Sequence, residues 1–258
     1  GVGALCTIEK SVTLTKALQA SAVTTPETCP GQQDGTITLT VTNGLAPYTY
    51  NWTSISGSPV VAANKNQSGL AAGDYHVQVT DARGCTFDLD VTINNQHVLD
   101  VVGAVTNVTC NGASTGAIDL TVSGGSGDFS YQWSSTGFTA TTQDITGLTA
   151  GSYTVVVADN VYGCQVTEVF PVTQPATPIT VVSADITPVL CYGNATGEID
   201  ITVTGGTAPY SYQWSTTSGA VVSVITEDQT GLIAGDYQVR ITDARGCYLD
   251  AGPYTAVS

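Results

Sequence analysis

Apolar and polar residues alternate one by one in several short stretches of this chain. Residues 36–42 read Thr-Ile-Thr-Leu-Thr-Val-Thr, and in another stretch Tyr75, Val77 and Val79 alternate with polar residues. Side chains two positions apart share one face of a β-strand, so each stretch predicts a strand with one buried and one exposed face. The spacing typical of an amphipathic helix does not recur along the chain. The pattern therefore predicts an all-β protein.

Aromatic side chains mark the strands that are expected to form the core. Tyr48, Tyr50 and Trp52 share one strand face, and the same arrangement returns at residues 129–133 and 210–214. Such a row could stack against sugar rings, but one face of each strand must be buried, and large aromatic side chains favour burial. The predicted core anchors are three tryptophans and three recurring tyrosines, Trp52, Trp133, Trp214, Tyr75, Tyr153 and Tyr237.

One segment recurs three times and defines a repeat. Gly69–Cys85 returns as Gly147–Cys164 and as Gly231–Cys247, and successive tryptophans are 81 residues apart. A unit of about eighty residues with short strands between turn residues is typical of a small immunoglobulin-like antiparallel β-sandwich. We therefore expect a tandem array of such domains. Its repeats are predicted at 19–97, 98–176 and 177–258, with residues 1–18 as the C-terminal end of a truncated preceding repeat.

Seven cysteines lie at recurring places in these repeats, which indicates a disulfide framework and an extracellular, cell-surface location. In each repeat one cysteine ends the first strand and another follows the last hairpin turn. If successive strands alternate in direction, both lie at the same end of the sandwich, so one disulfide is expected within each repeat. The predicted pairs are Cys29–Cys85, Cys110–Cys164 and Cys191–Cys247. Cys6 occupies a closing position, and its partner is expected upstream of Gly1; the alternative is a free thiol.

The charge of the chain excludes several kinds of partner. The net charge is −15, and only 10% of the residues are charged. A chain this acidic repels nucleic-acid phosphates and anionic membrane surfaces. The sequence also has no apolar run long enough to span a bilayer. We therefore expect neither nucleic-acid binding nor membrane insertion.

Candidate sites for chemistry are few. Loop carboxylates could hold calcium, which takes six to eight oxygen ligands. The candidates are Asp34, Asp81, Asp159, Asp243 and Glu198. A turn aspartate that hydrogen-bonds its own backbone explains Asp81 and Asp243 without a metal, so no cofactor is predicted. The two histidines, His76 and His97, do not recur between repeats, and a catalytic or zinc site needs more partners than they have. No enzyme is predicted.

Four motifs follow one another in each repeat. They are Cys-x-Gly-x-x-x-Gly, Gly-Gly-x-x-Pro-Tyr-x-Tyr-x-Trp, Gly-Leu-x-Ala-Gly-x-Tyr and Thr-Asp-Ala-x-Gly-Cys. The third repeat carries all four between Cys191 and Cys247, whereas the first has Asn43 for a glycine and the second departs at residues 127–129. The series resembles the SprB-type repeat of very large surface adhesins from gliding bacteria of the Bacteroidota. The resemblance implies an exported, cell-surface, multi-repeat adhesin or filament, delivered by type IX secretion.

These observations lead to three hypotheses. In the first, the chain is a non-catalytic, disulfide-stapled rod that forms a stalk or filament segment of an adhesin. Its partners are then other repeats of the same long chain and, in a filament, neighbouring subunits. In the second, it binds a surface glycan or a protein ligand through variable loops such as Ser56–Gln67. In the third, it is a spacer array in a larger secreted enzyme.

Overall fold

The computed structural model describes residues 16–218, 222 and 225–258. The described residues form β-strands and no helix, which confirms the prediction of an all-β, immunoglobulin-like fold. The strands follow the alternation of the sequence. In β5 (Gly73–Thr80), Tyr75, Val77 and Val79 are fully buried while the residues between them are partly exposed. Period-two patterning therefore directs the burial of the core.

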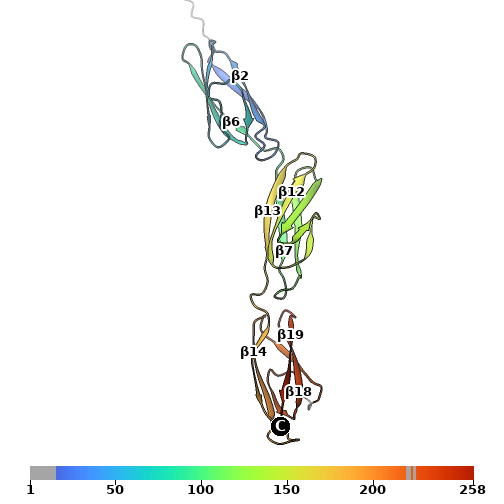
Figure 1. The fold of residues 1–258 in the computed structure, drawn as a ribbon. Helices are drawn as coiled ribbons and strands as arrows, with labels where there is room; N and C mark the ends of the chain where they lie inside the picture. Colours follow the sequence, from blue (N-terminus) through green and yellow to red (C-terminus); the bar gives the residue numbers. More distant parts are fainter. Residues whose placement is uncertain (1–15, 219–221, 223–224) are drawn as a thin grey trace, which may run out of the picture. The chain divides into compact units, whose positions relative to one another are not determined.

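The first repeat forms two three-stranded antiparallel sheets that enclose a core between them. Its strands are β1 (Gln19–Thr25), β2 (Gly35–Thr42), β3 (Thr49–Ser54), β4 (Gln67–Leu70), β5 and β6 (Thr86–Ile93). One sheet has the order β1-β2-β4 and the other β3-β5-β6. Figure 1 shows β2 and β6, which belong to different sheets of this repeat. Two packed sheets are the layers expected of a β-sandwich.

The second and third repeats each have two sheets as well, and the second repeat adds the strand β10 (Phe138–Ala140) to one of them. The second contains β7 (Leu99–Thr106), β8 (Gly116–Gly124), β9 (Phe129–Ser135), β10 (Phe138–Ala140), β11 (Ile145–Leu148), β12 (Gly151–Asp159) and β13 (Gln165–Val172). The third contains β14 (Thr180–Thr187), β15 (Gly197–Thr204), β16 (Ser211–Thr216), β17 (Gln229–Leu232), β18 (Gly235–Thr242) and β19 (Tyr248–Ala256). Their sheets have the orders β11-β8-β7 with β10-β9-β12-β13, and β14-β15-β17 with β16-β18-β19.

The described residues group into two compact units. The first unit contains the chain up to Asp100 together with residues 122–129 and 158–166. The second contains residues 101–121, 130–157 and the rest of the chain from Thr167. Residues of the second repeat thus belong to both units, and each unit is described separately below.

The tryptophans lie in the core and also hold a loop. Trp52, Trp133 and Trp214 are each at most 2% exposed. Their indole N–H groups donate hydrogen bonds of 2.9–3.0 Å to the carbonyls of Asn64, Thr142 and Thr226, which belong to the segments after β3, β9 and β16. The aromatic face therefore points inward, and each indole ties its following loop to the core.

The recurring tyrosines make a second shared contact. The hydroxyl groups of Tyr75, Tyr153 and Tyr237 donate hydrogen bonds to the carbonyls four residues upstream, at 2.6, 3.0 and 2.8 Å. A buried tyrosine bonded back to its own backbone is the tyrosine corner of immunoglobulin-like sandwiches. In these repeats the tyrosine is the third residue of its strand, β5, β12 or β18.

Replacing Tyr75 by Phe tests this contact. Its hydroxyl also accepts a hydrogen bond from the Ser58 amide at 3.1 Å. Y75F therefore leaves a part-buried donor, the Ser58 amide, and a part-buried acceptor, the Ala71 carbonyl, without this partner. It should destabilise the first repeat by about 1–3 kcal/mol. Hydrogen exchange of the β4 and β5 amides in the full chain measures this loss. The matched variant Y153F removes the bond to Thr149 and should cost about 1 kcal/mol. An equal or larger loss in Y153F would contradict the assignment.

Candidate functional site

Each repeat presents its two cysteines on two hydrogen-bonded turns. In the opening turn, the amide three residues after the cysteine donates to the cysteine carbonyl, at 3.1, 3.0 and 3.0 Å for Cys29, Cys110 and Cys191. In the closing turn, an aspartate amide donates to the carbonyl of the following cysteine. These distances are 2.9, 2.8 and 2.8 Å for the pairs Asp81–Cys85, Asp159–Cys164 and Asp243–Cys247. The opening turn thus keeps one spacing in all three repeats, whereas the closing turn of the second repeat contains one more residue than the other two.

The closing turn is built around its aspartate. Asp81 Oδ1 accepts hydrogen bonds from the amides of Arg83 and Cys85, both at 2.9 Å, and Oδ2 accepts one from the amide of Leu45 at 3.0 Å. Asp243 repeats this set with Arg245, Cys247 and Thr207. The carboxylate therefore closes its own turn and joins it to the neighbouring loop.

Asp159 makes the strongest version of this contact. It is 1% exposed and accepts hydrogen bonds from the amides of Val161, Tyr162 and Ser126 and from the Ser126 hydroxyl. Burial opposes ionisation of the carboxyl, but these donors outweigh it and lower its pKa to about 2. The same balance of burial against amide donors lowers the pKa of Asp81 and of Asp243. All three aspartates therefore hydrogen-bond the backbone of their own turns. This is the explanation without calcium that the sequence indicates for Asp81 and Asp243.

The structure pairs the cysteines across repeats. Disulfides join Cys29 to Cys164 and Cys110 to Cys247, with sequence separations of 135 and 137 residues. Each links the opening turn of one repeat to the closing turn of the next. The predicted pairs Cys29–Cys85, Cys110–Cys164 and Cys191–Cys247, one within each repeat, are therefore wrong. Cys85 and Cys191 are free and exposed, and Cys6 lies outside the described residues.

The direction of the strands explains why the two cysteines of one repeat do not pair with each other. Glu27, just before Cys29, bridges to Asn95 beyond the end of β6, whereas Cys85 directly precedes the start of β6. The eight residues of β6 span about 26 Å at about 3.3 Å per residue. A disulfide needs Cα atoms within about 7 Å. The two cysteines of one repeat thus lie at opposite ends of the sandwich and cannot meet.

The segment after β3 accounts for the error in the prediction. The prediction assumed that successive strands alternate in direction. Residues 55–66 contain no strand in the first repeat, yet they carry the chain from β3 to β4, and the Trp52 amide donates a hydrogen bond to the Ala62 carbonyl at 3.0 Å. In the second repeat the corresponding segment includes β10, which pairs antiparallel with β9. This additional pass places the closing turn at the opposite end.

The Cys29–Cys164 disulfide is buried in the first unit. Both cysteines are at most 3% exposed and pack with Leu99, Phe129 and Val166. Beside them Tyr162 stacks on His97, with ring centroids 3.5 Å apart and an angle of 8° between the rings. The junction between the two repeats is therefore packed as well as covalently closed.

Hydrogen bonds fix the same junction on the Cys29 side. The amides of Gln96 and His97 donate to the carbonyls of Glu27 and Thr28, at 2.8 and 3.1 Å. The buried Glu27 carboxylate in turn accepts hydrogen bonds from the amides of Gln33 and Ala72, at 2.7 and 2.8 Å. Glu27 thus ties the opening turn to two parts of its repeat.

The Cys110–Cys247 disulfide lies in the second unit and is fixed by different side chains. The Asn111 amide group donates to the carbonyl of Pro175 at 2.8 Å, and the Gly112 amide donates to Gln174 Oε1 at 2.8 Å. The segment of residues 173–178, where the second repeat meets the third, is thereby bonded to the opening turn. The connection is the same in both units although the supporting residues differ.

The remaining calcium candidates do not converge. Asp34 accepts hydrogen bonds from the amide and the hydroxyl group of Thr28, at 2.8 and 2.5 Å, and those bonds lower its pKa. Within the part of the chain that the structure describes, no three His, Cys, Asp or Glu side chains gather as metal ligands would. Glu198 lies on β15.

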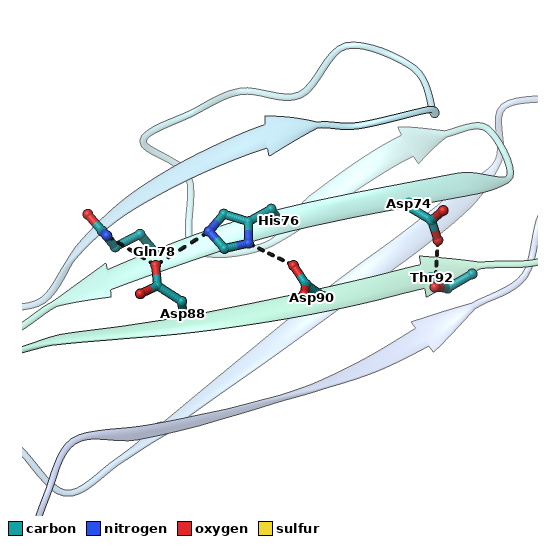
Figure 2. A network of polar contacts seen from close by, with 6 residues as sticks. All are labelled: Asp74, His76, Gln78, Asp88, Asp90 and Thr92. Carbon is teal, nitrogen blue, oxygen red and sulfur yellow. Dashed lines mark hydrogen bonds and ion pairs between the residues drawn. The ribbon is translucent and has the colours of Figure 1, made fainter.

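A network of polar side chains covers the outer face of β5 and β6 (Figure 2). His76 lies between two carboxylates, with Nδ1 at 2.7 Å from Asp90 Oδ1 and Nε2 at 3.4 Å from Asp88 Oδ1. Gln78 Nε2 donates to Asp88, and the Thr92 hydroxyl group donates to Asp74 at 2.7 Å. The hydrogen bond with Asp90 is the main cause that raises the pKa of His76.

This network stabilises the sheet rather than forming a catalytic pocket. Its residues are cross-strand partners, such as His76 with Asp90 and Gln78 with Asp88, and they lie on an open sheet face. In the third repeat the position of Gln78 is taken by Arg240, which makes two hydrogen bonds to Asp250, at 2.7 and 2.8 Å. Opposite charges across a strand pair are a common stabilising contact in sheets.

Comparison of the sequence with protein-family models identifies the repeats. The model of the SprB repeat matches residues 21–57, 102–138 and 183–219. The chain carries three SprB repeats. The matched segments contain the opening cysteines of these SprB repeats, whereas the closing cysteines lie beyond them. The match confirms the resemblance found in the motifs, and it supports an extracellular, adhesin-like repeat segment.

The chain is also similar to solved structures of multidomain proteins that share little sequence identity with it. Three N-terminal domains of the highly immunogenic outer capsid protein of bacteriophage RB49 share 15% identity, with a TM-score of 0.40 over 93% of this chain and 97% of that one. The eight N-terminal immunoglobulin domains of Down syndrome cell adhesion molecule share 11%, with a TM-score of 0.41 over 88% and 35%. Domains EC22–24 of mouse cadherin-23 share 12%, with a TM-score of 0.28 over 93% and 96%. No curated protein sequence matches the chain.

Membrane insertion through a helix was not expected from the sequence. The described residues contain no helix that is long and apolar enough to cross a bilayer.

The buried carboxylate of Asp159 predicts sensitivity to acid. Its pKa is depressed, so its contribution to stability is complete above the unfolded value of about 3.9 and is lost as the pH falls through about 2. D159N, which replaces an acceptor by a donor, should lower the thermal midpoint at pH 7 and flatten the loss of stability between pH 4 and pH 2. Thermal unfolding followed by circular dichroism measures both. The exposed Asp119 provides the control D119N, which should match the parent chain.

The histidine network predicts the opposite pH dependence. The folded-state pKa of His76 is raised, so its contribution is complete below about 6.5 and is lost as the pH rises through the raised value. Exchange protection of β5 and β6 should therefore decrease from pH 6 to pH 9, and H76Q should abolish this decrease. An NMR titration should show a larger drop of the His76 pKa in D90N than in D88N. Equal drops would mean that Asp90 is not its main partner.

Proposed function

We propose that these SprB repeats are a non-catalytic stalk segment of a cell-surface adhesin, in which disulfides between successive repeats resist extension. The observation that carries the proposal is the pairing of the opening turns at Cys29 and Cys110 with the closing turns of the repeats that follow them. Adhesion through long surface proteins places the connecting domains under tension. Covalent bonds that cross the domain junctions act directly against that tension.

The two disulfides define the path that force takes through the chain. Tension entering at Cys29 crosses to Cys164, returns along the backbone to Cys110 and crosses to Cys247. The strands of the first and third repeats that lie between Cys29 and Cys247 are outside this path. They remain folded or unfolded without changing the length of the stalk, so the array keeps its reach when the first or the third repeat opens.

Stability alone does not account for these long connections. In the chain-entropy model, a bond that closes about 135 residues stabilises the fold by about 5 kcal/mol, against about 4 kcal/mol for a bond within one repeat. The difference is small beside the strain that commonly reduces such values. The pairing across repeats therefore gains little in folding free energy, and its distinct effect is mechanical.

The environment that suits this role is extracellular. Disulfides persist outside the reducing cytosol, and the acidic, weakly charged surface provides solubility without affinity for anionic membranes. We therefore place the stalk at the cell surface, with type IX secretion and gliding motility as the setting implied by the repeat family. Its partners are then further repeats of the same kind.

Single-molecule pulling tests the proposal. In a C6S/C29S/C164S variant only Cys110–Cys247 remains, and it spans 137 residues. Reducing agent should then lengthen the fully extended chain by about 480 Å, at about 3.5 Å per residue. A gain of about 200 Å would indicate a bond between Cys191 and Cys247 instead, and would contradict the force path.

The control variant is C6S/C85S/C191S, which lacks the two exposed cysteines and keeps both disulfides. Its gain on reduction should equal that of C6S alone. If replacing Cys85 or Cys191 shortens the gain, these residues take part in the force path and the proposal fails.

A further inference from the structure

The outer face of the sheet β16-β18-β19 in the third repeat carries a hollow of about 420 Å³. Pockets for small ligands in proteins measure about 300–1,000 Å³, so the hollow has room for a small molecule. Trp214, Val239 and Ala251 also border it, but their side chains pack in the core on the other side of the sheet. The side chains that face the hollow are therefore polar, namely those of Gln213, Ser215, Gln238, Arg240 and Asp250.

A bulge in β19 lies beside the hollow. The register between β18 and β19 shifts after Tyr237, so Gln238 lies opposite two residues of β19, Gly252 and Pro253. Gly252 has a φ of +109°, and a Cβ atom there would lie 2.7 Å from the carbonyl oxygen of Tyr237. A side chain is therefore excluded at Gly252, which leaves room beside Gln238.

The first repeat closes the same place with side chains. Its strands β5 and β6 pair without a shift of register, and His76 lies opposite Asp90, at the place that Gln238 occupies in the third repeat. The His76 and Asp90 side chains bond at 2.7 Å (Figure 2). The first repeat thus uses this place to join two strands, whereas the bulge of the third repeat removes the partner.

The polar groups of the third repeat are consequently available to another molecule. Within the part of the chain that the structure describes, the side chains of Gln213, Ser215 and Gln238 make no hydrogen bond or ion pair. All three residues are exposed. A glutamine amide has a carbonyl acceptor and an NH₂ donor, and a serine hydroxyl group both donates and accepts. The hollow therefore offers donors and acceptors together.

Arg240 adds donors whose position is already fixed. It lies between Gln213 of β16 and Asp250 of β19 in the register of the sheet. Its Nε and Nη2 atoms donate to the two oxygens of Asp250 at 2.7 and 2.8 Å, and its Cζ atom lies 4.4 Å from the centre of the Tyr248 ring. These bonds use two of the five N–H donors of the guanidinium group. The other donors can bond a ligand with little further loss of side-chain freedom.

The charges in the hollow favour a neutral ligand. Arg240 and Asp250 neutralise each other, and no other charged side chain among the described residues lines the hollow. An anionic ligand would meet Asp250 and a chain of net charge −15, and a cationic one would have to displace Arg240. An apolar ligand would leave the free amides without partners. A molecule with several neutral hydroxyl groups meets all three conditions.

We propose that the outer face of β16, β18 and β19 in the third SprB repeat binds a neutral saccharide. Hydroxyl groups of the sugar bond the amides of Gln213 and Gln238, the hydroxyl group of Ser215 and the remaining N–H groups of Arg240. This inference goes beyond the proposed stalk role and does not depend on it, since all the lining residues belong to one repeat.

The second repeat provides an internal comparison. Gln132 and Ser134 line a hollow of about 770 Å³ on its corresponding sheet face. The place of Arg240 is taken there by Val156, so this hollow lacks the guanidinium group. We therefore expect the third repeat to bind the saccharide more tightly than the second.

An NMR titration of the whole isotope-labelled chain with neutral disaccharides tests the proposal. The probes are cellobiose, maltose, lactose, mannobiose and diacetylchitobiose, with digalacturonic acid as the anionic comparison. At least one neutral probe should shift the side-chain amide signals of Gln213 and Gln238 together with backbone signals of β16 and β18. Digalacturonic acid should leave these signals in place, and no probe should shift the side-chain amide of Gln78 in the first repeat.

Two variants locate the binding groups. Q238A removes one amide, and R240Q gives the third repeat the glutamine that the first repeat has at Gln78. Both residues are exposed, so both variants should keep the fold, which thermal unfolding checks. Each should weaken binding about tenfold, the factor expected for the loss of one hydrogen bond. Q78A is the matched control and should bind as tightly as the parent chain.

Three results would overturn the proposal. The first is that none of the neutral disaccharides shifts the side-chain signals of Gln213 and Gln238, even if signals on other faces move. The second is that digalacturonic acid shifts them as strongly as the best neutral probe. The third is an unchanged affinity in either Q238A or R240Q, or an equal loss of affinity in Q78A.

Discussion

The structure depends on one constraint, which is that the two cysteines of a repeat lie at opposite ends of its sandwich. Glu27 and Asn95 hold Cys29 beside the end of β6, while Cys85 stands before its start. No repeat can therefore close a disulfide on itself without unfolding. Each cysteine needs a partner from another repeat, and this requirement turns a row of small domains into a covalently connected array.

The closing aspartates make that connection reproducible. Asp81, Asp159 and Asp243 are buried, and each satisfies amide donors of its own turn and of the facing loop. Because the carboxylate remains ionised, the turn keeps one shape whether its cysteine is bonded or free. The free turn at Cys85 and the bonded turn at Cys247 thus share one set of hydrogen bonds. A preformed turn reduces the entropy that must be lost when the bond forms.

Side chains outside this framework vary between repeats. The first junction uses the buried Glu27 and the ring stack of His97 on Tyr162, while the second uses Asn111 and Gln174. On the sheet face, a glutamine in the first repeat corresponds to Arg240 in the third. The repeats therefore keep the same connection with different local contacts. A structural role needs the shared connection. Any difference in recognition between repeats would come from the local contacts that vary.

The sequence by itself determined the strands, the repeat and the core. Alternating residues such as Tyr75, Val77 and Val79 report burial directly, because neighbouring side chains of a strand point to opposite faces. The spacing of Trp52, Trp133 and Trp214 likewise defines the repeat. The turn role of the aspartates was also open to sequence reasoning, since a short carboxylate before a glycine bonds its own backbone.

Only the tertiary structure decided the partners of the cysteines. Pairing depends on which end of the sandwich a turn occupies, and that depends on how many times the chain crosses the domain. Residues 55–66 make one crossing without forming a strand, so alternation in the sequence does not register it. One uncounted crossing moves Cys85 from one end of the domain to the other. Local pattern thus fixed what each segment becomes, whereas the direction of the chain in space fixed which segments are joined.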